Sequence, residues 1–145
     1  MVAVTLAEEA ARTGSVKSFL YVSAIDSFFI LPKRYITTKR EAEERIAAIA
    51  KDAGMRGIYL RPSFLYDASR TFTLPLAAAT VVSSTLNNIF MKKLPLLGAA
   101  GYKPLSVDQV AGAAVKALEM EEMSGVVDVD GISQLADKVW REGML

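Results

Sequence analysis

Tyr35 and Lys39 are the residues of this sequence whose types and spacing best suit chemistry. They stand four apart in PKRYITTKREAEERI, residues 32–46, where an apolar stretch gives way to a charged pattern. A phenol has a pKa of about 10, so tyrosine serves as an acid–base catalyst near neutral pH only when something stabilises its anion. A lysine ammonium within about 4–6 Å does this, and residues i and i+4 are neighbours on a helix. The pair therefore predicts a proton donor with a helper cation.

Ser23 is the hydroxyl best placed to complete such a site. It lies near the end of VKSFLYVSA, residues 16–24, whose β-branched and aromatic residues predict a buried strand. In open α/β sheets, ligands lie beyond the carboxyl ends of the strands. Ser23 and the start of the helix that carries Tyr35 belong to that edge. We therefore expect Ser23 to hold a substrate carbonyl while Tyr35 donates its proton.

A competing local geometry leaves the pairing open. Thr38 and Glu41 have the T-x-x-E spacing of a capping box. If Thr38 were the N-cap, Tyr35 would lie outside the helix and would not pair with Lys39. The spacing Tyr-x-x-x-Lys is by itself a weak signal in a chain with five tyrosines. The alternative to a catalytic pair is the first turn of a surface helix.

The composition limits the other kinds of chemistry. The chain has 145 residues, enough for one domain with a core but not for two. It has no Cys and no His, so zinc, iron–sulfur and haem sites lose their usual ligands, and Cys–His and Ser–His catalysis are excluded. We expect no metal site. A net charge of +1, from 17 basic and 16 acidic residues, argues against nucleic-acid binding.

The elements that would position the pair alternate between helices and strands. Expected helices are a first one that Gly14 ends, then 35–53, 106–121 with a Ser106–Gln109 capping box, and 134–142; expected strands are 16–24, 57–67 and 126–130. The charged residues of 39–45 are expected to cover the surface of the second helix. This order predicts an α/β fold, a partial Rossmann-like doubly wound and mostly parallel sheet, in one domain over residues 1–145.

Three strands make a thin sheet with one long edge unpaired, which indicates that strands are missing. We therefore expect the chain to be unstable or oligomeric unless a partner supplies strands. The apolar stretch at 74–91 is interrupted by polar residues, whereas a membrane span needs about 20 mostly apolar ones. We expect a buried or partner-facing helix there and no transmembrane segment, with an interfacial membrane contact as the alternative. The first residues carry acids that a transit peptide lacks.

Four motifs follow in one order along the chain: YVSA, YITTKREAEERI, IYLRPSFLYD and PLSVDQVAGAAVKAL. That order resembles the rear half of an atypical or extended short-chain dehydrogenase/reductase, and the resemblance covers about residues 10–142. In that family a serine ends one strand, Tyr-x-x-x-Lys opens the next long helix, and an Arg-Pro segment ends the strand after it. Within the superfamily the chain most resembles the NAD(P)H-binding accessory subunit of respiratory complex I and fungal mitochondrial proteins associated with coenzyme Q biosynthesis.

The resemblance implies a role for each matching residue. Ser23 looks like the substrate-polarising hydroxyl, Tyr35 like the proton donor, and Lys39 like the cation that lowers the tyrosine pKa and bonds the nicotinamide ribose. Pro62 and Ser63 match the segment beside the nicotinamide. The resemblance further implies NAD or NADP as cofactor of the full-length protein, a mitochondrial location, a coenzyme Q biosynthetic complex as partner, and contact with a lipid or quinone.

The glycine-rich turn with which that family begins has no match in this sequence. Gly98 and Gly101 stand in a late connector and Gly112 stands inside an expected helix. We therefore expect an N-terminally truncated domain that lacks the βαβ nucleotide-binding unit and binds NAD(P)H weakly or not at all. Three functions stay open: an accessory or assembly role in mitochondrial ubiquinone biosynthesis, which the resemblance favours; an NAD(P)H-dependent reductase acting on a carbonyl; and an inactive truncated product.

Overall fold

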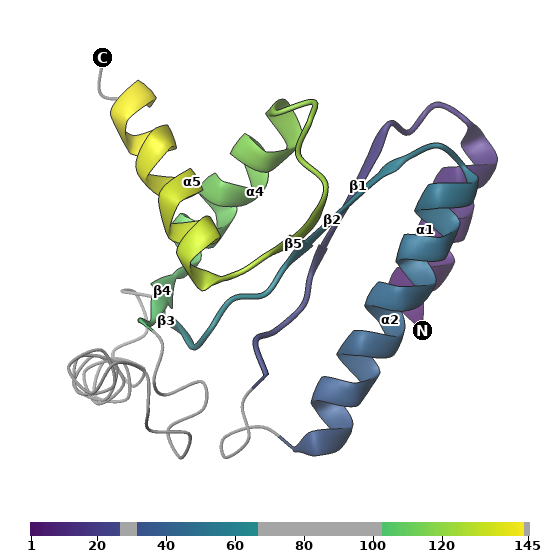
Figure 1. Cartoon of the computed structure of the whole chain (residues 1–145), viewed down its shortest axis with the longest axis horizontal. Helices are drawn as coiled ribbons and strands as arrows, with labels where there is room; N and C mark the ends of the chain where they lie inside the picture. Colours follow the sequence, from purple (N-terminus) through teal and green to yellow (C-terminus); the bar gives the residue numbers. More distant parts are fainter. Residues whose placement is uncertain (27–31, 67–102, 144–145) are drawn as a thin grey trace.

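The structure is a computed structural model that describes residues 1–26, 32–66 and 103–143 (Figure 1). Helices and strands alternate along the described ranges, as the sequence predicts. The helices are α1 (Val2–Thr13), α2 (Lys33–Asp52), α4 (Val107–Glu119) and α5 (Val129–Gly143); the strands are β1 (Ser18–Val22), β2 (Arg56–Leu60), β3 (Leu65–Tyr66), β4 (Leu105–Ser106) and β5 (Gly125–Val127). The α/β class is therefore confirmed, and the architecture is consistent with a partial Rossmann-like fold.

The main sheet is parallel and has the strand order β1-β2-β5. The strand expected over 57–67 is divided in two, because β2 stops at Leu60 and β3 begins at Leu65. Pro62 lies in the break, where it has no N–H to donate to a ladder. β3 pairs with β4 in a second, two-stranded parallel sheet, which the sequence did not predict.

Helices cover both faces of the main sheet (Figure 1). On one face, α1 and α2 pack over Phe19, Tyr21 and Tyr59. On the other face, α4 and α5 pack over Leu20, Ile58 and Leu60. Because successive side chains of a strand point to opposite faces, β1 and β2 each contribute to both cores. This arrangement is that of a doubly wound sheet.

Helix α2 begins at Lys33, with Pro32 as its N-cap, so Tyr35 and Lys39 both lie within it. The alternative in which Thr38 caps the helix is wrong, since the Thr38 hydroxyl donates to the carbonyl of Arg34 one turn back, at 2.8 Å. The predicted exposure of Glu43 is also wrong. That side chain was expected on the charged surface, but it is buried with the apolar residues of the helix.

The helix ends follow local sequence signals. α1 ends at Gly14, whose φ of 65° favours glycine, as expected. The capping box before α4 is confirmed, with Gln109 N donating to Ser106 Oγ at 3.1 Å and Ser106 N donating to Gln109 Oε1 at 2.9 Å. α5 starts at Val129 instead of Gln134, because Asp128 Oδ1 accepts from Gly131 N at 2.8 Å and caps the helix early.

Several expectations fall on residues outside the described ranges. These include the helix at 74–91 and the connector that carries Gly98 and Gly101. Among the residues that the structure does describe, no helix is long and apolar enough to cross a membrane. Within the same residues, no group of three or more acidic side chains is placed to hold a metal ion.

Candidate functional site

Tyr35 and Lys39 line the same pocket, one turn apart on α2. The pocket has a volume of about 250 Å³ and lies between the start of α1, Tyr21 of β1 and the first turns of α2. The Nζ atom of Lys39 is 5.7 Å from the centre of the Tyr35 ring and 4.9 Å from the centre of the Tyr21 ring. The fold thus brings together the phenol and the ammonium that the sequence pairs.

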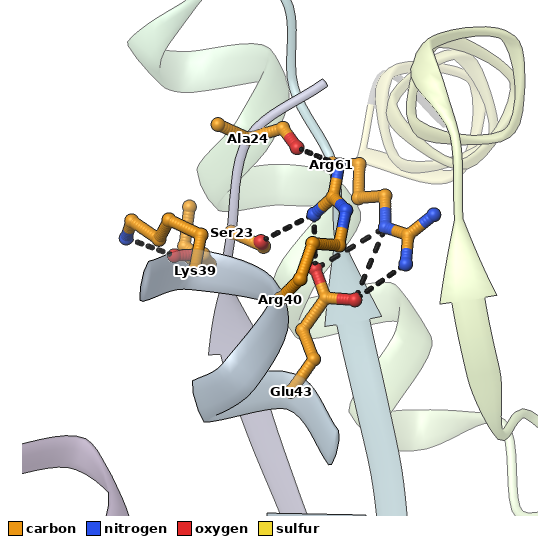
Figure 2. A network of polar contacts seen from close by, with 7 residues as sticks. Ser23, Ala24, Lys39, Arg40, Glu43 and Arg61 are labelled. Atoms are coloured by element: carbon orange, nitrogen blue, oxygen red, sulfur yellow. Dashed lines mark hydrogen bonds and ion pairs between the residues drawn. The ribbon is translucent and has the colours of Figure 1, made fainter. Parts of the chain in front are cut away.

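The ammonium of Lys39 has its hydrogen bond with the backbone. It donates to the carbonyl of Val22 at the end of β1, at 3.0 Å (Figure 2). The two tyrosine rings also attract it, since a cation near an aromatic face gains about 0.5–1 kcal/mol at exposed sites. A long lysine side chain is therefore held in one place by β1 and α2. Its recorded hydrogen bond goes to Val22 and not to the phenol of Tyr35.

Ser23 belongs to a different set of contacts. Its side chain is buried, and its Oγ accepts from Nη1 of Arg40 at 3.1 Å. Arg40 also donates to the carbonyl of Ala24 at 2.8 Å and to the carboxylate of Glu43 at 2.7 Å. Figure 2 shows these residues on one side of the end of β1 and the Lys39 side chain extending on the other.

Glu43 lies at the centre of this group, and its side chain is only 7% exposed. Arg61, just after β2, donates from Nε to both carboxylate oxygens at 3.2 Å and from Nη2 to one of them. Burial raises the pKa of Glu43, but the hydrogen bonds from Arg61 and Ser23 and the charges of Arg40 and Arg61 lower it by more, so the net pKa lies below its ordinary value. The hydrogen bond to Glu43 correspondingly raises the pKa of Arg61. The carboxylate is therefore charged near neutral pH.

The hydrogen bonds of Ser23 bear directly on its expected role. A serine hydroxyl has a single proton to donate. In this structure the hydroxyl oxygen accepts from Arg40, and Ser23 is among the groups that lower the pKa of Glu43. The role of Ser23 toward a substrate stays a prediction. The fold joins Tyr35 with Lys39 and engages Ser23 in the network of Arg40, Glu43 and Arg61.

Only one contact of this network could be predicted from the spacing of residues in the sequence. Arg40 and Glu43 have the i, i+3 spacing of a helical ion pair. Arg61 is 18 residues from Glu43 on a different element, and no spacing rule connects the two. The burial of Glu43 depends on both arginines, so a periodic pattern of apolar residues could not reveal it.

Pro62 and Ser63 follow the end of β2, at the carboxyl edge of the sheet. Pro62 is buried, and its carbonyl accepts from Ile25 N at 2.9 Å. The Ser63 hydroxyl donates to the carbonyl of Lys103 at 2.6 Å. These contacts connect the residues that follow β2 to the end of the β1 segment at Ile25 and to Lys103 before β4. The cofactor-binding role of both residues stays a prediction.

A dinucleotide needs open N–H groups at a helix N-terminus for its pyrophosphate, usually after a glycine-rich turn. Of the described helices that follow strands, α4 is capped by Ser106 and has an acid in its first turn, and α5 is capped by the carboxylate of Asp128. Negative charge at these ends disfavours a phosphate. α2 begins with a proline cap and not with glycine. The described residues therefore do not fit the phosphate part of NAD(P).

Comparison with known proteins gives two informative relatives, while no protein-family model matches the chain. The chain is 32% identical over 120 residues to MIOREX complex component 2 of Saccharomyces cerevisiae, a match that covers 80% of this chain and 43% of that protein. It is 26% identical over 147 residues to an uncharacterized chloroplastic protein of Arabidopsis thaliana, covering 92% of this chain and 48% of that one. The chain thus spans less than half the length of the curated relatives it matches. Its resemblance to the short-chain dehydrogenase/reductases stays a prediction.

Proposed function

We propose that this protein is an accessory or assembly component of a mitochondrial complex, and that its reductase-like fold is used for binding and not for turnover. The similarity to a yeast protein named as a component of the MIOREX complex supports membership of a complex and, weakly, a mitochondrial location. The name of the plant relative indicates a chloroplast, but its identity to this chain is lower. The order of motifs along the chain supports the narrower part of the proposal, a short-chain dehydrogenase/reductase-like protein with a role in ubiquinone biosynthesis.

The observation that carries the accessory role is the engagement of Ser23. A reductase of the expected kind needs a hydroxyl that donates to the substrate carbonyl beside the proton donor. Here the Ser23 hydroxyl is buried against Arg40 and Glu43. Lys39 donates to Val22 in place of a cofactor ribose. Both side chains thus contact other parts of the fold in this structure, which supports the accessory role.

The proposed ligands follow from the same features. NAD or NADP belongs to the full-length protein, with the nicotinamide end beside Tyr35, Lys39, Pro62 and Ser63, and this chain binds it weakly or not at all. The proposed partner is a mitochondrial coenzyme Q biosynthetic complex. A lipid or quinone contact would involve residues 74–91, which lie outside the described ranges.

The test is replacement of Tyr35 by Phe in the full-length protein, in cells that lack the native copy. The substitution removes only the phenolic hydroxyl, so the packing of the ring is kept. An accessory protein then supports ubiquinone content and co-fractionates with mitochondrial complexes as wild type does. Ubiquinone loss with normal co-fractionation would instead assign turnover to Tyr35.

A second candidate is an NAD(P)H-dependent reductase acting on a carbonyl substrate. Its support is the shared pocket in which Lys39 Nζ lies 5.7 Å from the Tyr35 ring centre. This candidate requires NAD(P)H oxidation by the purified full-length protein with a carbonyl substrate, and loss of that activity on the same Tyr35→Phe change. A third candidate, an inactive shortened product, requires that deletion of the chain leave ubiquinone content unchanged.

A further inference from the structure

Strand β1 has one edge with which no described residue pairs in a ladder. Among the described strands its only neighbour is β2. Backbone groups alternate along a parallel strand, so every second residue directs its N–H and C=O to the same side. Ser23 N donates to Leu60 O at 2.7 Å, which assigns the odd-numbered residues to the β2 side. The backbone groups facing the open edge are therefore those of Ser18, Leu20 and Val22.

The sequence of β1 is that of an interior strand. Natural edge strands are short, or carry Lys, Pro or a bulge that prevents further pairing. β5, at the opposite edge, has three residues, whereas β1 has five, SFLYV, without charge or proline. Phe19 and Tyr21 pack toward α1 and α2, and Leu20 packs toward the opposite core. These side chains are half-buried, and Val22 is exposed. Apolar side chains on both faces are typical of strands inside parallel sheets, which have a neighbour on each side.

Lys39 occupies one position of the open edge. Its Nζ donates to the carbonyl of Val22, which points away from β2. The ammonium thus supplies the hydrogen bond that an N–H of a neighbouring strand would make. A strand that paired with Val22 would displace Lys39 and leave its ammonium beside the ring of Tyr35, from whose centre Nζ is now 5.7 Å away.

We propose that the open edge of β1 is the docking site of an extended apolar strand supplied by polypeptide outside residues 1–145, which pairs with Leu20 and Val22 and displaces Lys39 from the Val22 carbonyl. The lengths of the relatives support this source, because the matches cover 43% and 48% of them and more than half of each lies outside. Unpaired backbone N–H and C=O groups at an apolar edge select a β-strand over other partners. The inference does not depend on the proposed function, since it rests on the backbone of β1.

Amide hydrogen exchange by NMR measures the edge directly. In the chain of residues 1–145 alone, we expect the amides of Leu20 and Val22 to exchange at least tenfold faster than those of Phe19 and Tyr21, which face β2. Co-expression with the part of the yeast relative outside the matched region, as a separate polypeptide, should slow Leu20 and Val22 at least tenfold. Slow exchange of these amides in the chain alone would mean that residues 67–102 or a second copy already cover the edge, and would overturn the proposal. Unchanged exchange in the co-expressed sample would overturn it as well.

Substitutions at Val22 separate edge pairing from folding. Val22→Pro removes an N–H that faces the open edge and leaves the bonds to β2 in place, which strands tolerate at an edge. Val22→Thr keeps the N–H and the β-branch, and is the matched control. With circular dichroism unchanged, Val22→Pro should lose co-purification with the yeast segment and Val22→Thr should keep it; equal binding by the two contradicts the proposal. Lys39→Met should strengthen binding about fivefold, because a competing hydrogen bond is removed, and unchanged or weaker binding would refute the displacement.

Discussion

Arg61 donates hydrogen bonds from two nitrogens, Nε and Nη2, to the carboxylate of Glu43, and so connects the end of β2 to the middle of α2. Arg40 extends the link to β1, since it bonds both Glu43 and Ser23 (Figure 2). The carboxyl ends of two neighbouring strands and the helix between them are thereby fixed to one buried carboxylate. The network holds the edge of the sheet at which a ligand site of this fold would lie.

Glu43→Gln should destabilise the chain strongly. The amide keeps the shape of the side chain but removes the carboxylate charge that two partly buried guanidinium groups share. Breaking one partner out of a buried pair costs about 3–5 kcal/mol, and we expect about 2–4 kcal/mol here because both arginines keep some contact with water. Urea unfolding measures the change. Glu44→Gln, on the exposed side of α2, is the control and should stay within about 0.5 kcal/mol.

The same carboxylate should make stability depend on acid. The pKa of Glu43 in the folded chain lies below its ordinary value of 4.5, because the bonds and charges of its partners outweigh burial. A lowered folded-state pKa contributes stability that is complete above pH 4.5 and is lost as pH falls through the folded value. The free energy of unfolding should therefore decrease as the pH is lowered below about 5. Its slope should be smaller in Glu43→Gln, and identical slopes in the two proteins would contradict this assignment.

Arg56→Ala should loosen the end of α4. The guanidinium donates to the carbonyls of Met120, Met123 and Leu118, at 2.5, 3.0 and 3.0 Å, and these carbonyls lie at or just past the last turn of the helix. The Met120 carbonyl keeps its bond from Met123 N, but the carbonyls of Leu118 and Met123 lose the guanidinium, at a cost of about 1–3 kcal/mol. Arg56→Lys should restore little, because an ammonium lacks the planar fork. Thermal unfolding checks this, with Arg12→Ala as control, since Arg12 makes an exposed pair with Glu9 and should matter little.

Much of the architecture could be predicted from local patterns. Gly14 marked the end of α1, Ser106 and Gln109 marked the start of α4, and Tyr35 and Lys39 were correctly placed one turn apart on a helix. These signals depend on residues close in sequence. Most of the features that the sequence did not predict depend on residues far apart in the chain.

The burial of Glu43 depends on Arg61, which lies just after β2, and so could not be predicted from the pattern of α2. The contact between Ser23 and Arg40 also joins residues far apart in the sequence, and no spacing rule connects them. The early start of α5 had a local cause, the cap by the Asp128 side chain.

NAD(P)H should bind this chain only weakly. The described helix ends that follow strands are capped by Ser106, Asp128 or Pro32, and none offers the glycine-rich cradle for a pyrophosphate. Titration of NADH and NADPH, followed by nucleotide fluorescence, should give no saturation below about 1 mM, a level that corresponds to about 4 kcal/mol of binding free energy. Saturation in the low micromolar range would contradict the prediction.

Ser23 bonds Arg40 within the network around Glu43 and has no such bond to Tyr35 or Lys39 among the described contacts. A double-mutant cycle in urea unfolding tests it most directly, because residues in one network are coupled and distant ones add. Ser23→Ala and Arg40→Met should show a coupling free energy of at least about 0.5 kcal/mol, while Ser23→Ala and Tyr35→Phe should be additive within about 0.3 kcal/mol. Additivity of the first pair together with coupling of the second would place the Ser23 hydroxyl at Tyr35 and contradict the account.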